Sequence, residues 1–365
     1  MTLRIAVDAR FTRIGHHDGI SRYGASLIEA VSKQASVLML ISDERQLALL
    51  PDLPWVKINS PLSPAELLVA LRVNRFRPDV VVSPMQTMGS WGRKYPLILT
   101  LHDLIYYSNP TPPGFLPLLV RALWRLYHLA YWPQRLLLNR SDVVATISET
   151  TRSLIKRHRL TRRPVRIVGN APQPGAVVRD PDAAPDKALL YMGSFMPYKN
   201  VETVVRGMEH LPGYTLHLLS RITPERQREL EALVPGGANV LFHNGVTDEE
   251  YDQLLRTATA LVTLSRAEGY GLPMIEAMSV GTPVVASDIP IFREVSGGAA
   301  VLVDPDNPEA FAAAVLALGE PQRWRQVSAS GLRRAAEYSW DTSAGQLIEA
   351  AQEAARQYRA RRPGR

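Results

Sequence analysis

The sequence predicts an α/β fold made of two Rossmann-like domains, each a doubly wound parallel sheet, that face each other across a cleft. Short runs rich in Val, Ile and Leu alternate with segments of helical periodicity, which implies right-handed crossovers between parallel strands. The alternation stops near residue 170, at a stretch rich in Pro, Gly and Asp, and then starts again. A chain of 365 residues is also too long for one ordinary hydrophobic core.

The first half of the chain carries the first alternation. A buried strand is expected at 3–9, a loop at 10–24 and a helix at 25–34. Further strands are expected at 36–42, 79–84, 97–103, 142–148 and 165–170. We therefore assign residues 1–170 to an N-terminal domain.

The second alternation fills most of the remaining chain. Strands are expected at 188–194, 214–220, 240–245, 260–265, 282–287 and 299–304. Helices are expected at 200–210, 224–233, 248–257, 273–280, 308–319 and 343–361. We assign residues 171–340 to a C-terminal domain and expect the helix within 341–365 to pack back towards the N-terminal domain. In such sheets ligands bind beyond the carboxyl ends of the strands.

The composition is that of a soluble globular protein, with 46% hydrophobic and 21% charged residues. Cysteine is absent, which excludes disulfides, zinc–thiolate sites and thiol catalysis and fits a reducing compartment such as the cytoplasm. The first eleven residues are typical of a strand and not of a secretory signal, because Asp8 and Arg10 interrupt the apolar run.

Charge is distributed unevenly along the chain. Residues 1–170 contain 23 Lys and Arg against 11 Asp and Glu, a net charge of +12, whereas residues 171–365 contain 19 against 24, a net charge of −5. Two interpretations stand. The basic half meets an anionic partner, such as a phosphorylated substrate, a lipid head group or nucleic acid, or its arginines are solvated surface charges.

The segment 115–138 mixes Phe, Leu, Trp and Tyr with basic side chains. Arg121, Arg125, His128 and Arg135 interrupt it, so it lacks the ~20 apolar residues that a membrane span requires. We favour a domain helix whose apolar face belongs to the core. The alternative is a surface helix that docks on an anionic membrane holding a lipid-linked acceptor.

The stretch "RAEGYGLPMIEAM" places two carboxylates, Glu268 and Glu276, on either side of a strand–loop–helix junction. The glycines of the loop let backbone amides approach a ligand closely, and the N-terminus of the following helix favours a phosphate. Carboxylates beside a phosphate fit a ligand that also carries neutral hydroxyls, as a sugar does. Taken alone, Glu276 is better explained by a local cap or ion pair. The stretch lacks the third glycine of a dinucleotide fingerprint, because Met274 stands there.

Two further junctions carry candidate residues. In "YMGSFMPYKN", Lys199 follows a Gly turn at the end of a strand and opens a helix, which suits a diphosphate, although most lysines are solvated. In "LILTLHDLIYY", His102 and Asp103 follow an apolar strand and are expected at its carboxyl end. We reject a metal site at His16 and His17, because adjacent side chains do not easily bind one ion and no helix-spaced partner exists.

Together these motifs resemble glycosyltransferase family 4, retaining enzymes of the GT-B fold that use nucleotide-activated sugars. "EGYGLPMIEAMSVGTPVVASD" is similar to the family's E-x7-E signature, and "GSFMPYKN" to its diphosphate loop. "GISRYG", "LHDLIY", "TISETTR" and "FHNGVTDEEYDQLLRTA" resemble further family segments in the same order. The resemblance extends over most of the chain.

The resemblance implies a role for each candidate residue. Glu268 would bind hydroxyls of the transferred sugar and His102 would lie near the anomeric carbon, which makes them the catalytic candidates. Glu276 would bind the ribose, and the loop at Val246 and Thr247 would line the base. The residues implied at the donor diphosphate are Lys199, Gly269, Tyr270, Gly271, Leu272, Gly19, Arg266 and Ser194.

Two departures from the family pattern concern this donor site. A second cation is common in the diphosphate loop, but Ser194 and Tyr198 stand at its positions here. We expect Arg266 to supply that charge. The strand at 214–220 is followed by Arg221 where a glycine is usual, so the base pocket is expected to differ.

The resemblance also implies the reaction. We expect transfer of a hexose, mannose first, from a nucleotide diphosphate sugar to a glycan or glycolipid hydroxyl in bacterial polysaccharide or glycolipid synthesis. GDP-mannose is the favoured donor and UDP-sugars come next, with no cofactor, no metal and no nucleic acid. The enzyme would be cytoplasmic, with peripheral contact at the inner face of the cell membrane. A sugar-nucleotide epimerase and a non-catalytic nucleic-acid-binding protein are the alternatives.

Overall fold

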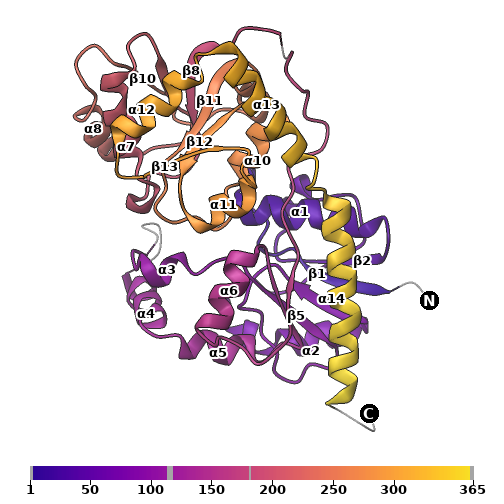
Figure 1. The fold of residues 1–365 in the computed structure, drawn as a ribbon. Helices are drawn as coiled ribbons and strands as arrows, with labels where there is room; N and C mark the ends of the chain where they lie inside the picture. Colours follow the sequence, from indigo (N-terminus) through magenta and orange to yellow (C-terminus); the bar gives the residue numbers. More distant parts are fainter. Residues whose placement is uncertain (1–2, 113–117, 181, 362–365) are drawn as a thin grey trace. The chain divides into compact units, whose positions relative to one another are not determined.

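The computed structural model describes residues 3–112, 118–180 and 182–361. Contacts divide the chain into two compact units (Figure 1). Unit 1 combines Met1–Asn170 with Ser339–Arg365, and unit 2 is Ala171–Tyr338. Each unit is a parallel sheet with helices on both faces, and the two are described separately below.

Unit 1 is built on a parallel sheet, seven-stranded in the part of the chain described, with the order β3-β2-β1-β4-β5-β6-β7. The strands are β1 (Arg4–Asp8), β2 (Ser36–Ile41), β3 (Trp55–Lys57), β4 (Val80–Ser83), β5 (Leu97–Leu101), β6 (Val143–Thr146) and β7 (Val165–Ile167). Successive strands are added on one side of β1 as far as β3, and from β4 onward they are added on the other side. The direction of winding therefore reverses between β1 and β4. Loops that follow these two strands therefore diverge and leave room for a ligand.

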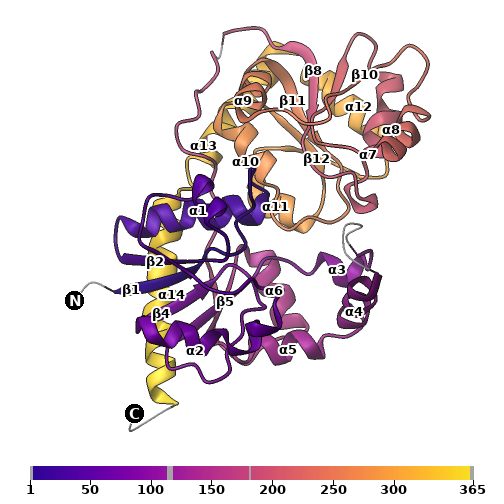
Figure 2. The same ribbon diagram turned by 180° about the vertical axis from the view of Figure 1, so that it is seen from behind.

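The helices of unit 1 cover both faces of this sheet. They are α1 (Gly19–Ser32), α2 (Val69–Val73), α3 (Ile105–Ser108), α4 (Leu118–His128), α5 (Trp132–Leu138), α6 (Glu149–Arg157) and α14 (Trp340–Ala360). The last helix, α14, lies along α1 and crosses the strands (Figures 1 and 2). Gly169 fixes its start, because its carbonyl accepts from Ser343 Oγ and its amide donates to Gln346 Oε1.

The helix α1 begins earlier than the sequence predicts. Asp18 caps it by accepting a hydrogen bond from the amide of Ser21, at 2.9 Å. Such caps satisfy amides that otherwise have no partner in the first turn. Gly19 is therefore the first helical residue and not part of an extended loop, which corrects the expected loop at 10–24.

Unit 2 repeats the design with a parallel sheet, six-stranded in the described residues, in the order β10-β9-β8-β11-β12-β13. The strands are β8 (Asp186–Tyr191), β9 (Thr215–Leu218), β10 (Asn239–Phe242), β11 (Ala258–Thr263), β12 (Val284–Ser287) and β13 (Val301–Val303). Here the winding reverses between β8 and β11. The strands expected from the sequence are all present.

The helices of unit 2 again lie on both faces. They are α7 (Val201–Gly207), α8 (Pro224–Glu231), α9 (Asp248–Thr257), α10 (Leu272–Ser279), α11 (Pro290–Ser296), α12 (Pro308–Ala317) and α13 (Pro321–Ala335). A fully buried cluster joins α7 and α12 to the sheet through Val204, Val205, Phe311 and Val315. The sequence prediction named no helix at α11 or α13.

The segment 115–138 forms α4 and α5, and residues 115–117 lie outside the described residues. No side chain of α4 is buried, and Leu119, Leu123 and Leu126 are 73%, 58% and 62% exposed. The expectation that the apolar face of this segment is core is therefore wrong for α4, whereas α5 buries Gln134 and Leu138. Among the described residues no helix has the length and apolarity needed to span a membrane.

Candidate active site

The point in unit 2 where the winding reverses holds most of the residues that the sequence singles out. The loop after β8 contains Ser194 and leads to a 3-10 turn at Pro197–Lys199. The loop after the neighbouring strand β11 contains Glu268, Gly269 and Gly271. Both loops leave the carboxyl edge of the same sheet, which is the usual ligand position in such folds.

An ion pair joins the two loops. Lys199 Nζ contacts Glu268 Oε2, and the side chains are only 14% and 16% exposed. The other carboxylate oxygen, Oε1, accepts a 3.3 Å hydrogen bond from the amide of Gly269. Charges that are largely removed from water must be paired, so this lysine and this carboxylate hold each other in place.

Asn200 explains why Lys199 lies where it does. Its backbone is left-handed, with φ 53° and ψ 40°, a region that Asn tolerates better than most residues. Its buried side-chain amide donates to the carbonyls of Leu264, at 3.0 Å, and Pro305, at 2.6 Å. One side chain thus ties the turn to the end of β11 and to the loop after β13.

The second predicted carboxylate lies on α10. Gly271 precedes this helix with φ 94°, and a Cβ on it would lie 2.8 Å from the Phe292 ring, so both conformation and space require glycine. Pro273 occupies the first turn as expected. Glu276 is the fifth residue of α10 and is partly buried. The start of α10 points its helix dipole at the Glu268 loop, as an anion site requires.

The structure gives Arg266 a different partner from the expected one. Its guanidinium contacts Asp306, with Nε at 2.8 Å from Oδ1, and both side chains are about half exposed. Its backbone amide donates to the Tyr198 carbonyl at 2.8 Å, which adds a backbone link between the two loops. Arg266 is therefore next to the turn, but its charge is paired with Asp306. Ser194 is exposed, and its carbonyl accepts from the Tyr191 hydroxyl at 2.7 Å.

The predicted base-side residues lie after β10, two strands away from β8. Thr247 caps α9, because its hydroxyl accepts from the Glu250 amide and its amide donates to the Glu250 carboxylate. Val246 precedes it and is partly buried. Arg221, which stands where the family usually has a glycine, packs against Gly245. A Cβ added to Gly245 would lie 3.0 Å from the Arg221 side chain.

Arg226 is a cation beside the loop after β8 that sequence reasoning missed. It lies on α8, and its Nε donates to the Phe195 carbonyl at 3.1 Å, while its other nitrogens contact Glu202 and Glu229. The signal for it is weak, because Arg226 lies on a short polar helix with no motif. The loop backbone is thus supported by a cation that stands 31 residues further along the chain.

In unit 1, His102 directly follows β5 and its ring is fixed on two sides. Its Nε2 lies 2.7 Å from the Pro84 carbonyl, which can only accept, so Nε2 carries the proton and Nδ1 is left with its lone pair. Tyr23 from α1 packs edge-on against the ring at 5.1 Å. Burial lowers the pKa of His102 below its ordinary value, although the Pro84 hydrogen bond and the Asp18 carboxylate oppose this. The imidazole is therefore neutral at pH 7.

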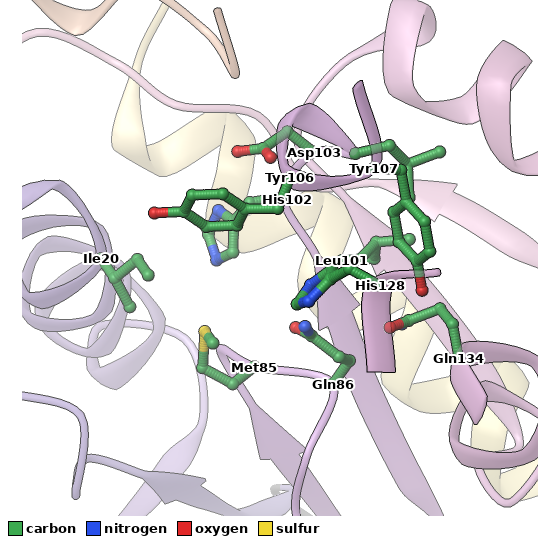
Figure 3. Close-up of a pocket in the computed structure, with 11 residues that line it drawn as sticks. Ile20, Met85, Gln86, Leu101, His102, Asp103, Tyr106, Tyr107, His128 and Gln134 are labelled. Carbon is green, nitrogen blue, oxygen red and sulfur yellow. The ribbon is translucent and has the colours of Figure 1, made fainter. Parts of the chain in front are cut away.

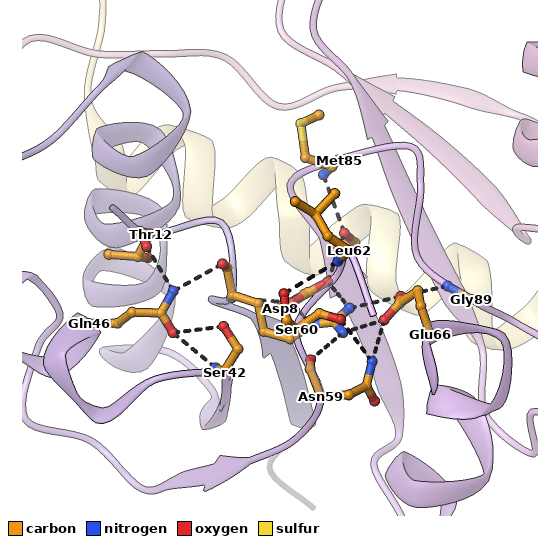
Figure 4. Close-up of polar contacts among 12 residues, drawn as sticks. Asp8, Thr12, Ser42, Gln46, Asn59, Ser60, Leu62, Glu66, Met85 and Gly89 are labelled. Carbon is orange, nitrogen blue, oxygen red and sulfur yellow. Dashed lines mark hydrogen bonds and ion pairs between the residues drawn. The ribbon is translucent and has the colours of Figure 1, made fainter. Parts of the chain in front are cut away.

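A buried ionic network holds the turn that contains Pro84 (Figure 4). Arg10 donates to both carboxylate oxygens of Asp8, at 2.7 and 2.9 Å, and also to Glu66. Asp8 accepts from Ser83 Oγ, at the end of β4, and Glu66 accepts from the Gly89 amide at 3.0 Å. These links fix both ends of residues 83–89. Sequence reasoning missed this network, since Arg10 and Glu66 stand 56 residues apart.

A cavity of about 100 Å³ lies beside His102 in unit 1 (Figure 3). Its wall comes from the ends of β4 and β5 and from α1, α3, α4 and α5. The residues that line it are Ile20, Met85, Gln86, Leu101, His102, Asp103, Leu104, Tyr106, Tyr107, His128 and Gln134. Asp103, the partner of His102 in the sequence motif, uses Oδ1 to accept from the Ile105 amide at 3.0 Å.

Within residues 3–112, 118–180 and 182–361, no group of three or more His, Cys, Asp or Glu side chains is arranged to hold a metal ion.

Two family models match the chain. The model described as "Glycosyltransferase Family 4" matches residues 19–171, and the one described as "Glycosyl transferases group 1" matches residues 186–320. This chain belongs to the glycosyltransferases. The two matches cover the carboxyl-edge loops of unit 1 after β4 and β5 and those of unit 2 after β8 and β11.

Curated relatives of this glycosyltransferase include two mannosyltransferases. The O-antigen chain mannosyltransferase B of Escherichia coli is 33% identical over 169 residues, which is 44% of each chain. The MMP alpha-(1->4)-mannosyltransferase of Mycolicibacterium hassiacum is 34% identical over 169 residues, covering 41% of this chain and 40% of the relative. The matched segment thus spans less than half the length of these relatives.

Solved structures show that this glycosyltransferase has the GT-B fold. Sucrose-phosphate synthase from Thermosynechococcus elongatus has a TM-score of 0.74 at 19% identity, covering 96% of this chain and 98% of that one. Anabaena HepE in complex with UDP and glucose has a TM-score of 0.73 at 17% identity, covering 96% and 99%. At this level of identity the likeness concerns the fold alone.

The glycosyltransferase thus gathers the predicted residues into a group in each unit. In unit 2, Lys199, Glu268 and the start of α10 lie at one edge of the sheet, and Glu276 follows one turn into that helix. In unit 1, His102 follows β5 and Gly19 begins α1. The roles that the family resemblance implies for them stay predictions.

The hydrogen bond from His102 to Pro84 leads to a prediction for the glycosyltransferase in solution. Because the folded pKa lies below the ordinary value of 6.5, the unfolded chain binds the proton more readily, so this stabilisation is complete above pH 6.5 and is lost as the pH falls through the folded pKa. Nitrogen-15 NMR should show a neutral ring with its proton on Nε2 at pH 7, with the signal assigned by its loss in His102→Gln. A proton on Nδ1 at pH 7 would contradict this geometry.

Proposed function

We propose that the protein is a retaining, metal-independent glycosyltransferase that moves a hexose, with mannose favoured, from a nucleotide diphosphate sugar to a hydroxyl of a glycan or glycolipid. The observation that carries the proposal is the Lys199–Glu268 ion pair where the winding of unit 2 reverses. A cation suits the diphosphate and a carboxylate suits sugar hydroxyls, and these two parts are adjacent in a nucleotide sugar. Unit 2 is accordingly the donor-binding unit and unit 1 the acceptor-binding unit.

The chemistry of transfer explains why these groups are needed. Cleavage of the glycosyl–phosphate bond builds negative charge on the departing diphosphate and positive character on the sugar ring. Lys199 and the amides from Gly269 to Leu272, at the start of α10, stabilise the first charge. The carboxylate of Glu268 accepts hydrogen bonds from sugar hydroxyls and holds the ring in orientation. Glu276 accepts from the ribose, and Val246 and Thr247 line the base.

His102 serves the developing positive charge on the sugar. A neutral imidazole whose Nδ1 keeps its lone pair offers the negative end of a dipole, and a protonated ring would oppose the reaction. Gly19 lets the start of α1 approach the donor without a side chain. Arg226 supports the diphosphate loop from α8, and Arg266 adds charge if the diphosphate draws it away from Asp306.

GDP-mannose is the first donor proposed. The names of two curated mannosyltransferases support it. The solved Anabaena protein in complex with UDP-glucose supports a UDP-sugar as the next choice. Metal independence is proposed because Lys199 and the helix start supply the positive charge that a divalent ion would otherwise provide.

The proposal predicts opposite outcomes for two lysines of unit 2. Lys199→Ala should lower turnover about 100-fold or more, because one preorganised charge at a developing anion is worth that much. Glu268→Ala should do the same by releasing the sugar. Lys187→Ala is the matched control, since Lys187 stands at the start of β8, opposite the site, and it should retain activity. For each variant, the measurement is the rate at which nucleoside diphosphate is released from GDP-mannose and from UDP-sugars.

Near wild-type turnover in either site variant would contradict the assignment. The same assay in excess EDTA should give unchanged rates, and complete loss there would contradict metal independence. Sugar isomerisation without nucleoside diphosphate release would favour the epimerase, and no reaction with any donor would favour a non-catalytic protein.

We also propose peripheral contact of unit 1 with an anionic membrane. The exposed leucines of α4, at 119, 123 and 126, follow helical spacing, and Arg121 and Arg125 stand between them. Apolar side chains enter the head-group region, and basic ones attract anionic lipids. The net charge of +12 on residues 1–170 supports the same partner. In this proposal the enzyme works at the inner face of the cell membrane, beside a lipid-linked acceptor.

Vesicle sedimentation tests this contact. The wild-type protein should sediment with vesicles in which about a third of the lipid is phosphatidylglycerol, and it should sediment much less with vesicles of pure phosphatidylcholine. Leu123→Ser combined with Leu126→Ser should lose the binding without loss of stability, since both side chains are exposed. Leu62→Ser, at a leucine that is 90% exposed elsewhere in unit 1, is the control and should bind normally. Equal sedimentation of all three proteins, or of none, would contradict the proposal.

A further inference from the structure

Two neighbouring loops of unit 2 are joined to each other at the carboxyl edge of the sheet. They are residues 219–223, after β9, and residues 243–247, after β10, and we call them the paired loops. The backbone amide of Ile222 in the first loop donates to Asn244 Oδ1 in the second, at 3.1 Å. The two loops therefore form one continuous surface at the edge where ligands bind in such folds.

A further contact links the paired loops to the loop after β8, which is proposed to hold the diphosphate. Ser220 Oγ accepts a hydrogen bond from the Gly193 amide at 3.0 Å. The strand β10 lies two strands from β8, which is a distance of roughly 10 Å. A nucleotide whose phosphates lie at Lys199 therefore extends along this edge, with its base over the paired loops.

Arg221 is held against the second of the paired loops. A Cβ added to Gly245 would lie 3.0 Å from Arg221 Cγ and 3.4 Å from Nε, so the Arg221 stem runs along bare glycine backbone. Gly245 has a left-handed φ of 108°, and its amide donates to the Leu219 carbonyl at 3.0 Å. This packing keeps the guanidinium of Arg221 beside Val246, which is proposed to line the base.

The guanidinium of Arg221 has no acidic partner. It makes no hydrogen bond or ion pair to a residue that the structure describes. The arginines of the following helix differ in this respect, since Arg226 contacts Glu202. Arg228 likewise contacts Glu225. A guanidinium without a partner keeps its five N–H donors available for a ligand.

The other polar side chains of the second loop are already engaged. Asn244 uses Oδ1 to hold the first loop. His243 Nε2 lies 2.9 Å from His217 Nδ1, on the neighbouring strand. The hydroxyl and amide of Thr247 both contact Glu250 in the cap of α9. Arg221 is therefore the side chain of the paired loops best able to distinguish one base from another.

The edge of a base decides how well it binds a guanidinium. Guanine presents two adjacent acceptors, N7 and O6, which accept a parallel pair of hydrogen bonds from one arginine. A pyrimidine such as uracil offers only O4 at this edge, and adenine places an amino donor beside N7. An arginine beside the base therefore favours guanine over both.

We propose that Arg221 selects a guanine nucleotide by donating two hydrogen bonds, to O6 and N7 of the base. The inference rests on the proposed glycosyltransferase function and names the residue that decides the base of the donor. It also explains the departure from the family pattern, because the glycine that is usual at this position has no side chain to donate.

Calorimetric titration of nucleoside diphosphates tests this selection. The wild-type protein should bind GDP at least about tenfold more tightly than UDP or ADP, as one bidentate base contact does elsewhere. Arg221→Met keeps a stem against Gly245 and removes the donors. It should lower the preference for GDP over UDP about tenfold, with little change in UDP binding.

A base analogue tests the contact with N7 itself. The analogue 7-deaza-GDP has a carbon in place of N7 and is otherwise the same ligand. The wild-type protein should bind it about tenfold more weakly than GDP, since a hydrogen bond from a charged donor is lost. Arg221→Met should bind GDP and 7-deaza-GDP equally, which a purely structural role for Arg221 would not produce.

Arg228→Met is the matched control for the loss of charge. Arg228 lies on α8 with 72% of its side chain exposed, and it contacts Glu225 and the Pro224 carbonyl of its own helix. This variant should keep the preference of the wild type for GDP. Both variants should also keep its melting temperature, because both side chains are exposed.

Two outcomes would overturn the inference: the wild-type protein binds UDP as tightly as GDP, or Arg221→Met keeps the preference for GDP. The proposed function is tested separately, by nucleoside diphosphate release that depends on Lys199. A protein that releases UDP from a UDP-sugar, loses this activity in Lys199→Ala and binds GDP no better than UDP would retain the proposed function and lose this inference.

Discussion

The ion pair between Lys199 and Glu268 is the interaction on which the proposed donor site depends. It joins residues 69 positions apart at the edge where β8 and β11 lie side by side, and both side chains are largely buried. Before a donor arrives, each charge is the other's partner, so neither stays unpaired away from water. Asn200 and the hydrogen bond from Arg266 to Tyr198 keep the two loops at this spacing. In the proposed mechanism a nucleotide sugar enters by taking Lys199 for its diphosphate and Glu268 for its sugar.

The alternation of strands and helices in the sequence predicted both sheets, because β-branched runs and helical periods depend on nearby residues alone. It also predicted which strand each motif follows, and therefore that Lys199 and Glu268 share an edge. The contacts that support them were not predicted. Arg226 reaches its loop from another helix, and Arg10 pairs with Glu66 across 56 residues, and such contacts depend on tertiary packing.

The helix α4 shows a second limit of sequence reasoning. The sequence predicted a helix with an apolar face within residues 115–138, where the structure has α4 and α5, but the residue pattern does not say what covers that face. The leucines of α4 at 119, 123 and 126 are exposed.

The central claim is that Lys199 serves the diphosphate and Glu268 the sugar. Calorimetric titration of GDP and UDP, which lack the sugar, tests it most directly. Lys199→Met should bind the nucleotide that the wild type prefers at least about tenfold more weakly, since a hydrogen bond to a charged group is worth ~1.5–3 kcal/mol. Glu268→Gln should bind it more tightly than the wild type, because a competing carboxylate is gone. Equal losses in both variants, or no loss in Lys199→Met, would contradict the account.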